Sequence, residues 1–381
     1  MRFSCTQENL KRGLAISGSL SGKNVNLPIL SNVLIRTEGS TITLLSTNLE
    51  IAVSCGLRGK VDEPGEFTVP AKLFLDYVNL LPEDKVDMEL IGENLKVTCR
   101  KNTTKIKGLA SSEFPLIPGL DRQTAFYLDA HDLKDALKQT LFAASNVESR
   151  PELTGVFFNI NPKFAPGKVV LAATDSYRLA ERTIGLKDGP SAKSTDKSVG
   201  VIVPGRTLHE VARILSIFKD DELDAPVEIV LGESQVAFHF ADVELISRVI
   251  EGRYPDYRPI IPERFTTEAT VGKDALAQAV KGAALFARSG LQDVHFSLEA
   301  STGITVASAE GQLGKNESQV EAAVTGGKNA ITVNYKYFLD GLTAADGSKM
   351  KFRMIDAMNP CVLTPENADN GYLYIVMPIK Q

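Results

Sequence analysis

Histidine is scarce in this chain of 381 residues. Only four occur, and none belongs to an HExxH sequence or to a Cys/His group with the spacing of metal ligands. The GxSxG sequence of nucleophilic hydrolases and the GxGxxG sequence of dinucleotide-binding proteins are also missing. These absences argue against the common metalloenzymes, hydrolases and dehydrogenases. We therefore expect no catalytic residue, no metal ion and no cofactor.

Two glycine–lysine pairs suggest phosphate-binding loops but do not fit the pattern. Residues 18–24 are one residue too short for GxxxxGK[ST]. Both this segment and residues 326–329 carry asparagine where such a loop needs a hydroxyl that binds Mg²⁺. We interpret both as surface loops with an exposed lysine.

Cysteine and long apolar runs are also rare. The four cysteines, Cys5, Cys55, Cys99 and Cys361, are widely spaced and form no CxxC pair, which indicates buried thiols in a reducing compartment. No run approaches the ~18 apolar residues of a membrane-spanning helix, and the first residues lack the apolar stretch of a secretory signal. We expect a cytoplasmic protein with no membrane partner.

The charge balance is slightly acidic, with 42 Lys and Arg against 47 Asp and Glu and a net charge of −5 at pH 7. A protein that coats nucleic acid with its whole surface would be basic. A basic face opposite an acidic one is still allowed, because net charge does not say where charges lie. At about 150 residues per domain, the length predicts two or three domains.

An amphipathic pattern recurs three times, at residues 8–15, 131–138 and 274–281. In each copy, apolar residues four positions apart, such as Leu10 and Leu14, mark one buried face of a helix, and basic residues lie beside that face. The sequence therefore predicts three equivalent helices.

A second pattern also recurs, at residues 69–76, 203–210 and 333–340. Each copy ends a strand at Val, starts a helix at Pro or Asn, and carries Lys or Arg four residues before an acid. Helix propensity does not require a basic residue at this position in all three copies.

Short alternating runs fill the space between these helices, as is typical of antiparallel strands. A third pattern closes each copy, at residues 113–118, 253–260 and 374–379. The sequence therefore predicts an α+β fold of three similar domains, each with two helices and antiparallel sheets. The expected domain boundaries are 1–122, 126–254 and 262–381. The alternating runs are 33–37, 42–44, 156–160, 169–171, 294–298 and 304–306.

The order of these patterns resembles that of the β sliding clamp of bacterial DNA polymerase III, over the whole chain. Three segments carry the resemblance: TDSYRLA at 174–180, EGRYPDYR at 251–258 and YIVMPI at 374–379. The resemblance implies a non-catalytic processivity factor, in which two chains close head to tail around duplex DNA. It also implies partners that carry short linear peptides, namely the replicative polymerase, the clamp loader and repair proteins.

Simple geometry is consistent with a ring of two chains. Neighbouring helices pack ~9 Å apart, so two helices from each of three repeats in two chains would leave a hole roughly 23 Å across. Duplex DNA needs about 20 Å. The helices of one chain alone would leave only about 6 Å.

With this resemblance, we expect a set of basic residues to face the DNA, whereas the acidic excess lies outside. Sequence-independent attraction to phosphates permits sliding. Lys23 and Arg150 follow the first helix of their repeats and could touch DNA more directly. The expected residues are Lys11, Arg12, Lys23, Lys72, Lys134, Lys138, Arg150, Arg206, Arg213, Lys281, Arg288 and Lys336.

The resemblance also implies an apolar peptide pocket between the second and third domains. Ser176 and Tyr177 stand where the family usually has Gly-His, Pro259 stands at an often basic position, and Gln381 at a commonly apolar one. These departures bear on which peptide is preferred. The implied pocket residues are Leu153, Thr174, Ser176, Tyr177, Arg178, Leu179, Pro255, Ile260, Met358, Ile375, Val376, Met377 and Pro378.

For the joint between the two chains, the resemblance implies that Leu285 and Phe286 of one chain meet Lys72, Phe74 and Ile106 of the other.

Two other classes of protein are compatible with the repeats. One is an enzyme with an active site formed by Asp175, Arg178 and Glu310, and the other is a scaffold that binds proteins but never DNA. Asn48, Asp175 and Glu310 occupy equivalent turn positions in the three repeats, which favours a structural role for them.

Overall fold

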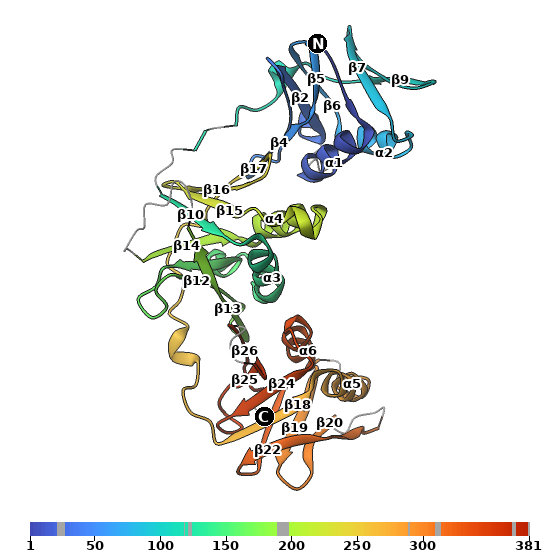
Figure 1. Ribbon diagram of the computed structural model, residues 1–381. Helices are drawn as coiled ribbons and strands as arrows, with labels where there is room; N and C mark the ends of the chain where they lie inside the picture. The colour runs from blue at the N-terminus through green and yellow to red at the C-terminus, as the bar shows by residue number, and fades with distance from the viewer. Residues whose placement is uncertain are drawn as a thin grey trace. The chain divides into compact units, whose positions relative to one another are not determined.

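The computed structural model describes residues 1–20, 27–117, 119–120, 124–188, 198–288, 290–308, 314–367 and 371–379. The chain divides into two compact units. Figure 1 labels the helices and strands from which they are built. Unit 1 comprises Met1–His131, Leu186–Ser194 and His209–Val249. Unit 2 comprises Asp132–Gly185, Thr195–Leu208 and Ile250–Gln381.

Unit 1 is built from antiparallel strands and the first two helices. Its sheets run in the orders β5-β1-β7-β8-β9 and β6-β2-β3-β4-β17-β16-β15-β10. Its elements are β1 (Arg2–Thr6), α1 (Gln7–Ser17), β2 (Asn32–Glu38), β3 (Thr41–Thr47), β4 (Ile51–Leu57), β5 (Gly59–Glu63), β6 (Gly65–Pro70), α2 (Ala71–Asn79), β7 (Lys85–Ile91), β8 (Asn94–Cys99), β9 (Asn102–Lys107), β10 (Thr124–Leu128), β15 (Val227–Leu231), β16 (Gln235–Phe240) and β17 (Val243–Arg248).

Unit 2 is also antiparallel. Its sheets run in the orders β14-β11-β12-β13-β26-β25-β24-β18-β22 and β21-β20-β19-β23. Its elements are β11 (Gly155–Ile160), β12 (Lys168–Thr174), β14 (Val199–Pro204), β18 (Thr267–Gly272), α5 (Lys273–Ala284), β19 (Asp293–Glu299), β20 (Gly303–Ser308), β21 (Glu317–Val320), β22 (Ala322–Gly326), β23 (Asn329–Asn334), α6 (Tyr335–Ala344), β24 (Lys349–Met354), β25 (Cys361–Pro365) and β26 (Tyr372–Val376).

Three elements contribute residues to both units: α3 (Ala130–Thr140), β13 (Arg178–Lys187) and α4 (Gly205–Ile217). The reason is sheet continuity. Within unit 1, β17 of the second repeat pairs with β4 of the first, and within unit 2, β13 of the second repeat pairs with β26 of the third. The middle repeat is therefore shared between the two units.

Two of the helices begin at a residue whose side chain caps the first turn. In α1, the Thr6 hydroxyl accepts a hydrogen bond from the Asn9 N–H, and Leu10 and Leu14 are fully buried. In α6, the Asn334 side chain accepts from the N–H groups of Lys336 and Tyr337. This explains how asparagine can stand where the other two repeats have proline.

The structure confirms the predicted helices and strands. The helical patterns form α1 to α6, and the alternating runs form β2, β3, β11, β12, β19 and β20. The cysteines are buried and free, as expected, and burial raises the pKa of Cys5, Cys55 and Cys361 to about 12. In the described part of the chain, no helix is long and apolar enough to cross a membrane.

One sequence equivalence was wrong. The sequence pattern equates residues 374–379 with the segments 113–118 and 253–260, which follow the last strand of their repeats. Instead, Tyr374–Val376 belong to β26, which pairs with β13 as β17 pairs with β4. The first half of the YIVMPI run is thus a sheet strand. It is apolar because it lies between two neighbouring strands, β13 and β25.

A glycine of α6 allows the close packing of the third repeat. A Cβ at Gly341 would overlap the ring of Tyr374, which is fully buried and donates its hydroxyl to the Tyr337 carbonyl at 2.7 Å. We expect Gly341→Ala to lower the free energy of unfolding by about 1–3 kcal/mol, because neither helix nor strand can move apart without breaking packing.

Urea denaturation would measure this change. Gly282→Ala in α5 is the matched control, because the nearest atom to its added Cβ is 3.9 Å away and the helix gains about 0.5–1 kcal/mol. Equal stability of the two variants would contradict the packing argument.

Candidate functional site

A tight turn joins β12 to β13 in unit 2 and carries several expected pocket residues. Asp175 Oδ1 accepts hydrogen bonds from the N–H groups of Tyr177 and Arg178, at 3.0 and 3.1 Å. The Thr174 hydroxyl accepts from Ser176 N–H and donates to the Arg178 carbonyl. Ser176 has a φ of 79°, so the turn forces a non-glycine residue into the left-handed region.

The turn between β3 and β4 in unit 1 has the same hydrogen bonds. Asn48 Oδ1 accepts from the N–H groups of Glu50 and Ile51, Thr47 bonds Leu49 N–H and the Ile51 carbonyl, and Leu49 has a φ of 77°. Asn48 and Asp175 therefore both serve as turn acceptors, which supports the structural interpretation over a catalytic one. Glu310 lies outside the described residues.

Arg178 is held on every side of its guanidinium. It pairs with Asp175 at 2.9 Å and Asp340 at 2.6 Å, donates to the Phe142 carbonyl at 2.6 Å, and lies 4.6 Å from the centre of the Tyr337 ring. Burial acts to lower the pKa of Arg178, but Tyr374 and the two carboxylates outweigh it and raise the pKa. Arg178 thus joins the second and third repeats rather than presenting a reactive group.

The strand pairing of β13 with β26 forms the floor of the expected pocket. Leu179 lies opposite Ile375, Arg178 lies opposite Val376, and Met377 N–H donates to the Tyr177 carbonyl at 2.9 Å. Leu179 and Ile375 share a buried apolar cluster with Leu153.

The expected pocket residues divide into three groups by exposure. Leu153, Thr174, Leu179, Ile375 and Val376 are buried. Arg178, Pro255, Met377 and Pro378 are half-buried, and Ser176, Tyr177, Ile260 and Met358 are exposed. Tyr177, one of the departures from the family, stacks on Tyr337 with ring centres 6.4 Å apart.

Sequence reasoning missed two side chains of the segment that follows β17, those of Tyr254 and Tyr257. Tyr254 stacks on Phe157 with ring centres 5.0 Å apart, and the Tyr257 hydroxyl donates to Glu181 Oε2 at 2.6 Å. Both tyrosines are buried in the same cluster as Leu179. The signal was present, because both tyrosines belong to the EGRYPDYR segment, but only Pro255 was chosen from it.

The six lysines expected to face DNA lie on α1, α2, α3, α5 and α6, and α3 carries two of them. Each is exposed or half-buried, and none lies within ion-pair distance of a carboxylate in the described part of the chain. They are Lys11, Lys72, Lys134, Lys138, Lys281 and Lys336.

The expected arginines are engaged differently. Arg213 donates to the Ala15 and Ile16 carbonyls at 2.8 and 2.7 Å and pairs with Glu210. It therefore neutralises the carbonyl end of α1 from α4, where a helix favours a cation.

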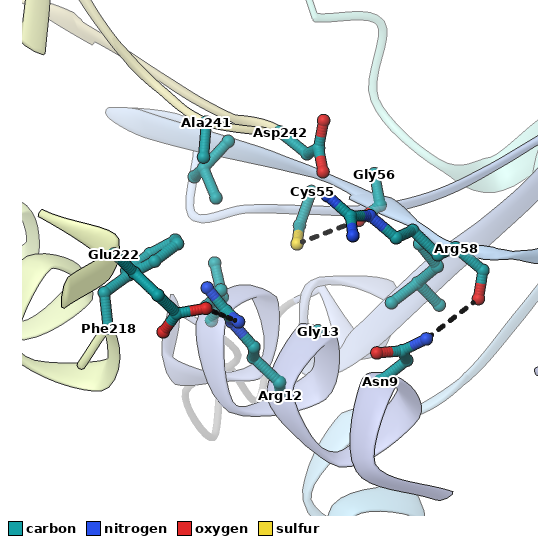
Figure 2. Close-up of a pocket in the computed structure, with 13 residues that line it drawn as sticks. Asn9, Arg12, Gly13, Cys55, Gly56, Arg58, Phe218, Glu222, Ala241 and Asp242 are labelled. Carbon is teal, nitrogen blue, oxygen red and sulfur yellow. Dashed lines mark hydrogen bonds and ion pairs between the residues drawn. The ribbon is translucent and has the colours of Figure 1, made fainter. Parts of the chain in front are cut away.

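Arg12 lines a cavity of about 300 Å³ in unit 1 (Figure 2). It pairs with Glu222 at 2.6 Å, and its guanidinium lies 4.2 Å from the centre of the Phe218 ring. Figure 2 shows that Arg12 projects from α1 toward the carboxylate of Glu222.

Two further arginines are also paired. Arg288 pairs with the buried Asp293, and Arg150 lies 3.2 Å from Glu152 and donates to the Ser176 hydroxyl. Arg206 is exposed at the start of α4, and Lys23 lies outside the described residues.

Two residues expected at the joint between chains are buried within the single chain. Phe74 and Ile106 are 0% and 4% exposed and pack in the apolar cluster of the first repeat. Leu73, which was not predicted, is 56% exposed beside Phe74. Leu285 is 75% exposed, whereas Phe286 is half-buried.

Comparison with known proteins identifies a class that matches this architecture. Family models of the N-terminal, central and C-terminal domains of the DNA polymerase III beta subunit match residues 1–118, 127–256 and 258–380. Beta sliding clamps of Staphylococcus aureus and Staphylococcus epidermidis are 30% and 29% identical over 367 residues, covering 93% of this chain and 92% of each relative.

Solved structures agree with this class. The DNA polymerase sliding clamp of Bacillus subtilis is 26% identical with a TM-score of 0.89, covering 100% of this chain and 99% of that one. The Pseudomonas aeruginosa sliding clamp bound to griselimycin is 25% identical with a TM-score of 0.91, covering 100% of both chains. The fold is thus that of a DNA polymerase sliding clamp, with three clamp domains.

The chain belongs to the DNA polymerase III beta subunit family, which confirms the resemblance found in the sequence. It is a processivity clamp of DNA replication, and the family is that of a non-catalytic subunit.

The half-buried Glu181 beneath the expected pocket makes the free energy of unfolding depend on pH. Burial raises the pKa of Glu181, and the hydrogen bond from Tyr257 and the charge of Arg258 oppose that rise only in part. The contribution of Glu181 to the free energy of unfolding is therefore fully present below the pKa of an unfolded glutamate. It is lost as pH rises through the higher pKa of Glu181 in the folded protein. We expect the stability of the wild type, relative to Glu181→Gln, to fall with rising pH over this window.

Urea denaturation from about pH 4 to about pH 8 would measure this difference. Glu299→Gln is the matched control with the opposite sign, because the hydrogen bond from Lys328 lowers the pKa of Glu299. A wild-type advantage over Glu181→Gln that rises with pH would contradict the assignment.

Proposed function

We propose that two copies of this chain close head to tail into a ring that encircles duplex DNA and tethers the replicative polymerase. Membership of the sliding-clamp family is the observation that carries this proposal. The hole estimated for the helices of two chains, roughly 23 Å, admits a duplex of about 20 Å.

Six lysines on the helices would provide the attraction to DNA. Their ammonium groups have no carboxylate partner in the described structure, so they are free to compensate phosphate charge without base contacts. Four of the expected arginines would attract DNA more weakly, because each is paired with a carboxylate that offsets its charge. They are Arg12, Arg150, Arg213 and Arg288. Arg206 and Lys23 would add to the attraction. Sliding requires such weak, sequence-independent attraction.

The joint between chains would use two exposed sheet edges and the leucines beside them. β9 and β21 each lie at the edge of their sheet, and an edge strand offers unpaired backbone groups to another strand. Leu73 on α2 and Leu285 after α5 are large exposed apolar side chains in the same repeats as β9 and β21, respectively. We propose that Leu285 and Phe286 meet Lys72 and Leu73 of the partner, with Phe74 and Ile106 supporting them from the core.

The surface over β13 and β26 would capture short peptides from the polymerase, the clamp loader and repair proteins. A floor of buried aliphatic side chains under an exposed rim of Tyr177, Ile260 and Met358 suits an extended peptide with apolar anchors. Tyr177 stacked on Tyr337 gives the rim an aromatic face.

The same proposal assigns no catalytic residue or cofactor, domain boundaries near 1–122, 126–254 and 262–381, and a cytoplasmic location. The turn role shared by Asp175 and Asn48 supports the first point.

A ring predicts that DNA is held by topology. We expect the wild-type clamp, loaded by its clamp loader on nicked circular DNA, to stay bound during gel filtration and to leave when the DNA is linearised. Leu285→Asp should abolish retention and shift the sedimentation mass to the 41.3 kDa of one chain, because it introduces a carboxylate into an apolar joint.

Leu116→Asp is the control, since Leu116 is also exposed and lies outside the proposed joint. Retention of the wild type on linear DNA with free ends would contradict the topological mechanism.

The peptide pocket predicts a separate loss of binding. We expect Leu179→Ala and Met377→Ala to weaken binding of a peptide from the replicative polymerase by about tenfold or more, because each removes apolar contact from the site. Fluorescence anisotropy of the labelled peptide measures this, with Leu291→Ala as an exposed control elsewhere in unit 2. Unchanged affinity in both pocket variants would refute the site.

A further inference from the structure

A hollow of about 870 Å³ lies in unit 1, where residues 111–117 and 119–120 cross the face of β2, β3, β4 and β17. Its lining includes Leu45, Ala52, Phe114 and Ile246. A second hollow of about 270 Å³ shares Ala52, Ile246 and the crossing segment with it.

This hollow is the counterpart, in the first two repeats, of the peptide surface in the last two. Ala52 pairs with Ile246 across β4 and β17, as Leu179 pairs with Ile375 across β13 and β26. The turns that precede β4 and β13 have the same hydrogen bonds and the same left-handed residue.

The crossing segments also match. Phe114 and Tyr254 are both buried and each is followed by proline, and the next residues, Leu116 and Asp256, are both exposed. The equivalence therefore extends from the sheet to the segment that covers it.

Three smaller side chains explain why this copy is hollow. Ala52 stands for Leu179, Ser54 for Glu181, and Ile117 for Tyr257. In unit 2, the Tyr257 hydroxyl and the Glu181 carboxylate form a hydrogen bond that fills this space. Serine and isoleucine cannot form that bond, so the covering segment is held by apolar contacts through Phe114 and Ile117.

We propose that this hollow is a second docking site, which binds a short extended peptide with alternating apolar side chains next to basic residues. The apolar side chains of the peptide would contact the apolar lining, which includes Leu45, Phe114 and Ile246. Leu116, at the mouth of the hollow, is 97% exposed and would contact them too. The basic part follows from charge: Arg36 is neutralised by Glu66, so the carboxylates of Glu38 and Glu244 leave the lining negative.

This site is additional to the pocket over β13 and β26, and its analogy to that pocket rests on the proposed function. The experiment must therefore report the two sites separately. Methyl NMR of the full chain does so, because Ile246 reports the hollow and Ile375 reports the pocket.

The probe is the capped heptapeptide Lys-Lys-Ala-Leu-Ala-Phe-Ala, whose Leu and Phe lie on one side of an extended chain. We expect saturable shifts of the Ile246 methyl. Ala52→Leu, which restores the leucine of the second repeat, should weaken this binding by about tenfold or more. Replacing both lysines of the peptide by glutamate should weaken it by a similar factor.

Two further variants complete the design. Ile117→Tyr fills the hollow from the covering segment and replaces Ala52→Leu if that variant does not fold. Leu179→Ala should alter the response of Ile375 and leave that of Ile246 unchanged, so failure of the proposed pocket is distinguishable from failure of the second site.

The proposal is overturned if the peptide shifts Ile375 alone or neither methyl, or if the filling variants bind it as the wild type does. It is also overturned if the Ile246 methyl of the Leu285→Asp variant, which cannot form the proposed ring, shifts with protein concentration in the absence of peptide, because the occupant would then be a second copy of the chain.

Discussion

Antiparallel pairing across repeat boundaries is the constraint on which the rest of the structure depends. The pairs β4–β17 and β13–β26 join one repeat to the next by backbone hydrogen bonds, which depend little on side-chain identity, and side chains then add specificity. At the first boundary, Arg213 and Arg12 supply those side chains, and at the second boundary Arg178 does. Each boundary thus couples a non-specific ladder with a specific guanidinium.

The same constraint explains why binding surfaces arise at boundaries. A pair of strands from different repeats must be covered by the segment that leads from one repeat to the next, and the fit between segment and sheet depends on few side chains. Where Tyr254, Tyr257 and Leu179 are present, the space is filled. Where Phe114, Ile117 and Ala52 take their places, a hollow results.

Much of the fold could be predicted from the sequence because the same sequence patterns recur in three repeats. The helical pattern, the strand-to-helix pattern and the alternating runs agree with one another, so a chance match in one copy does not mislead. The last strand was misassigned, because a short apolar run such as YIVMPI has no periodicity that separates a buried strand from a covering segment.

The candidate site was less predictable, because exposure is a tertiary property. Nothing in the local sequence separates Leu73, which is exposed, from Phe74, which is buried, until the helix is set against its core. Likewise, Lys11 and Arg12 are adjacent and both basic, yet of the two only Arg12 meets a carboxylate among the described residues, that of Glu222, 210 positions away. Tyr257 and Glu181 are recognisable as a pair only once β13 is beside the covering segment.

Several arginines are paired with carboxylates, whereas the six lysines have no carboxylate partner in the described part of the chain, and this contrast has a consequence for motion along a duplex in the proposed ring. Guanidinium groups fixed in one geometry would bind the phosphates best at particular positions of the clamp along the duplex. The clamp would then pause at each of these positions. Ammonium groups on long, freely rotating stems can exchange one phosphate for the next in small increments. A ring lined with such groups would meet only small energy barriers between neighbouring positions on the DNA. The closed clamp could therefore slide rapidly.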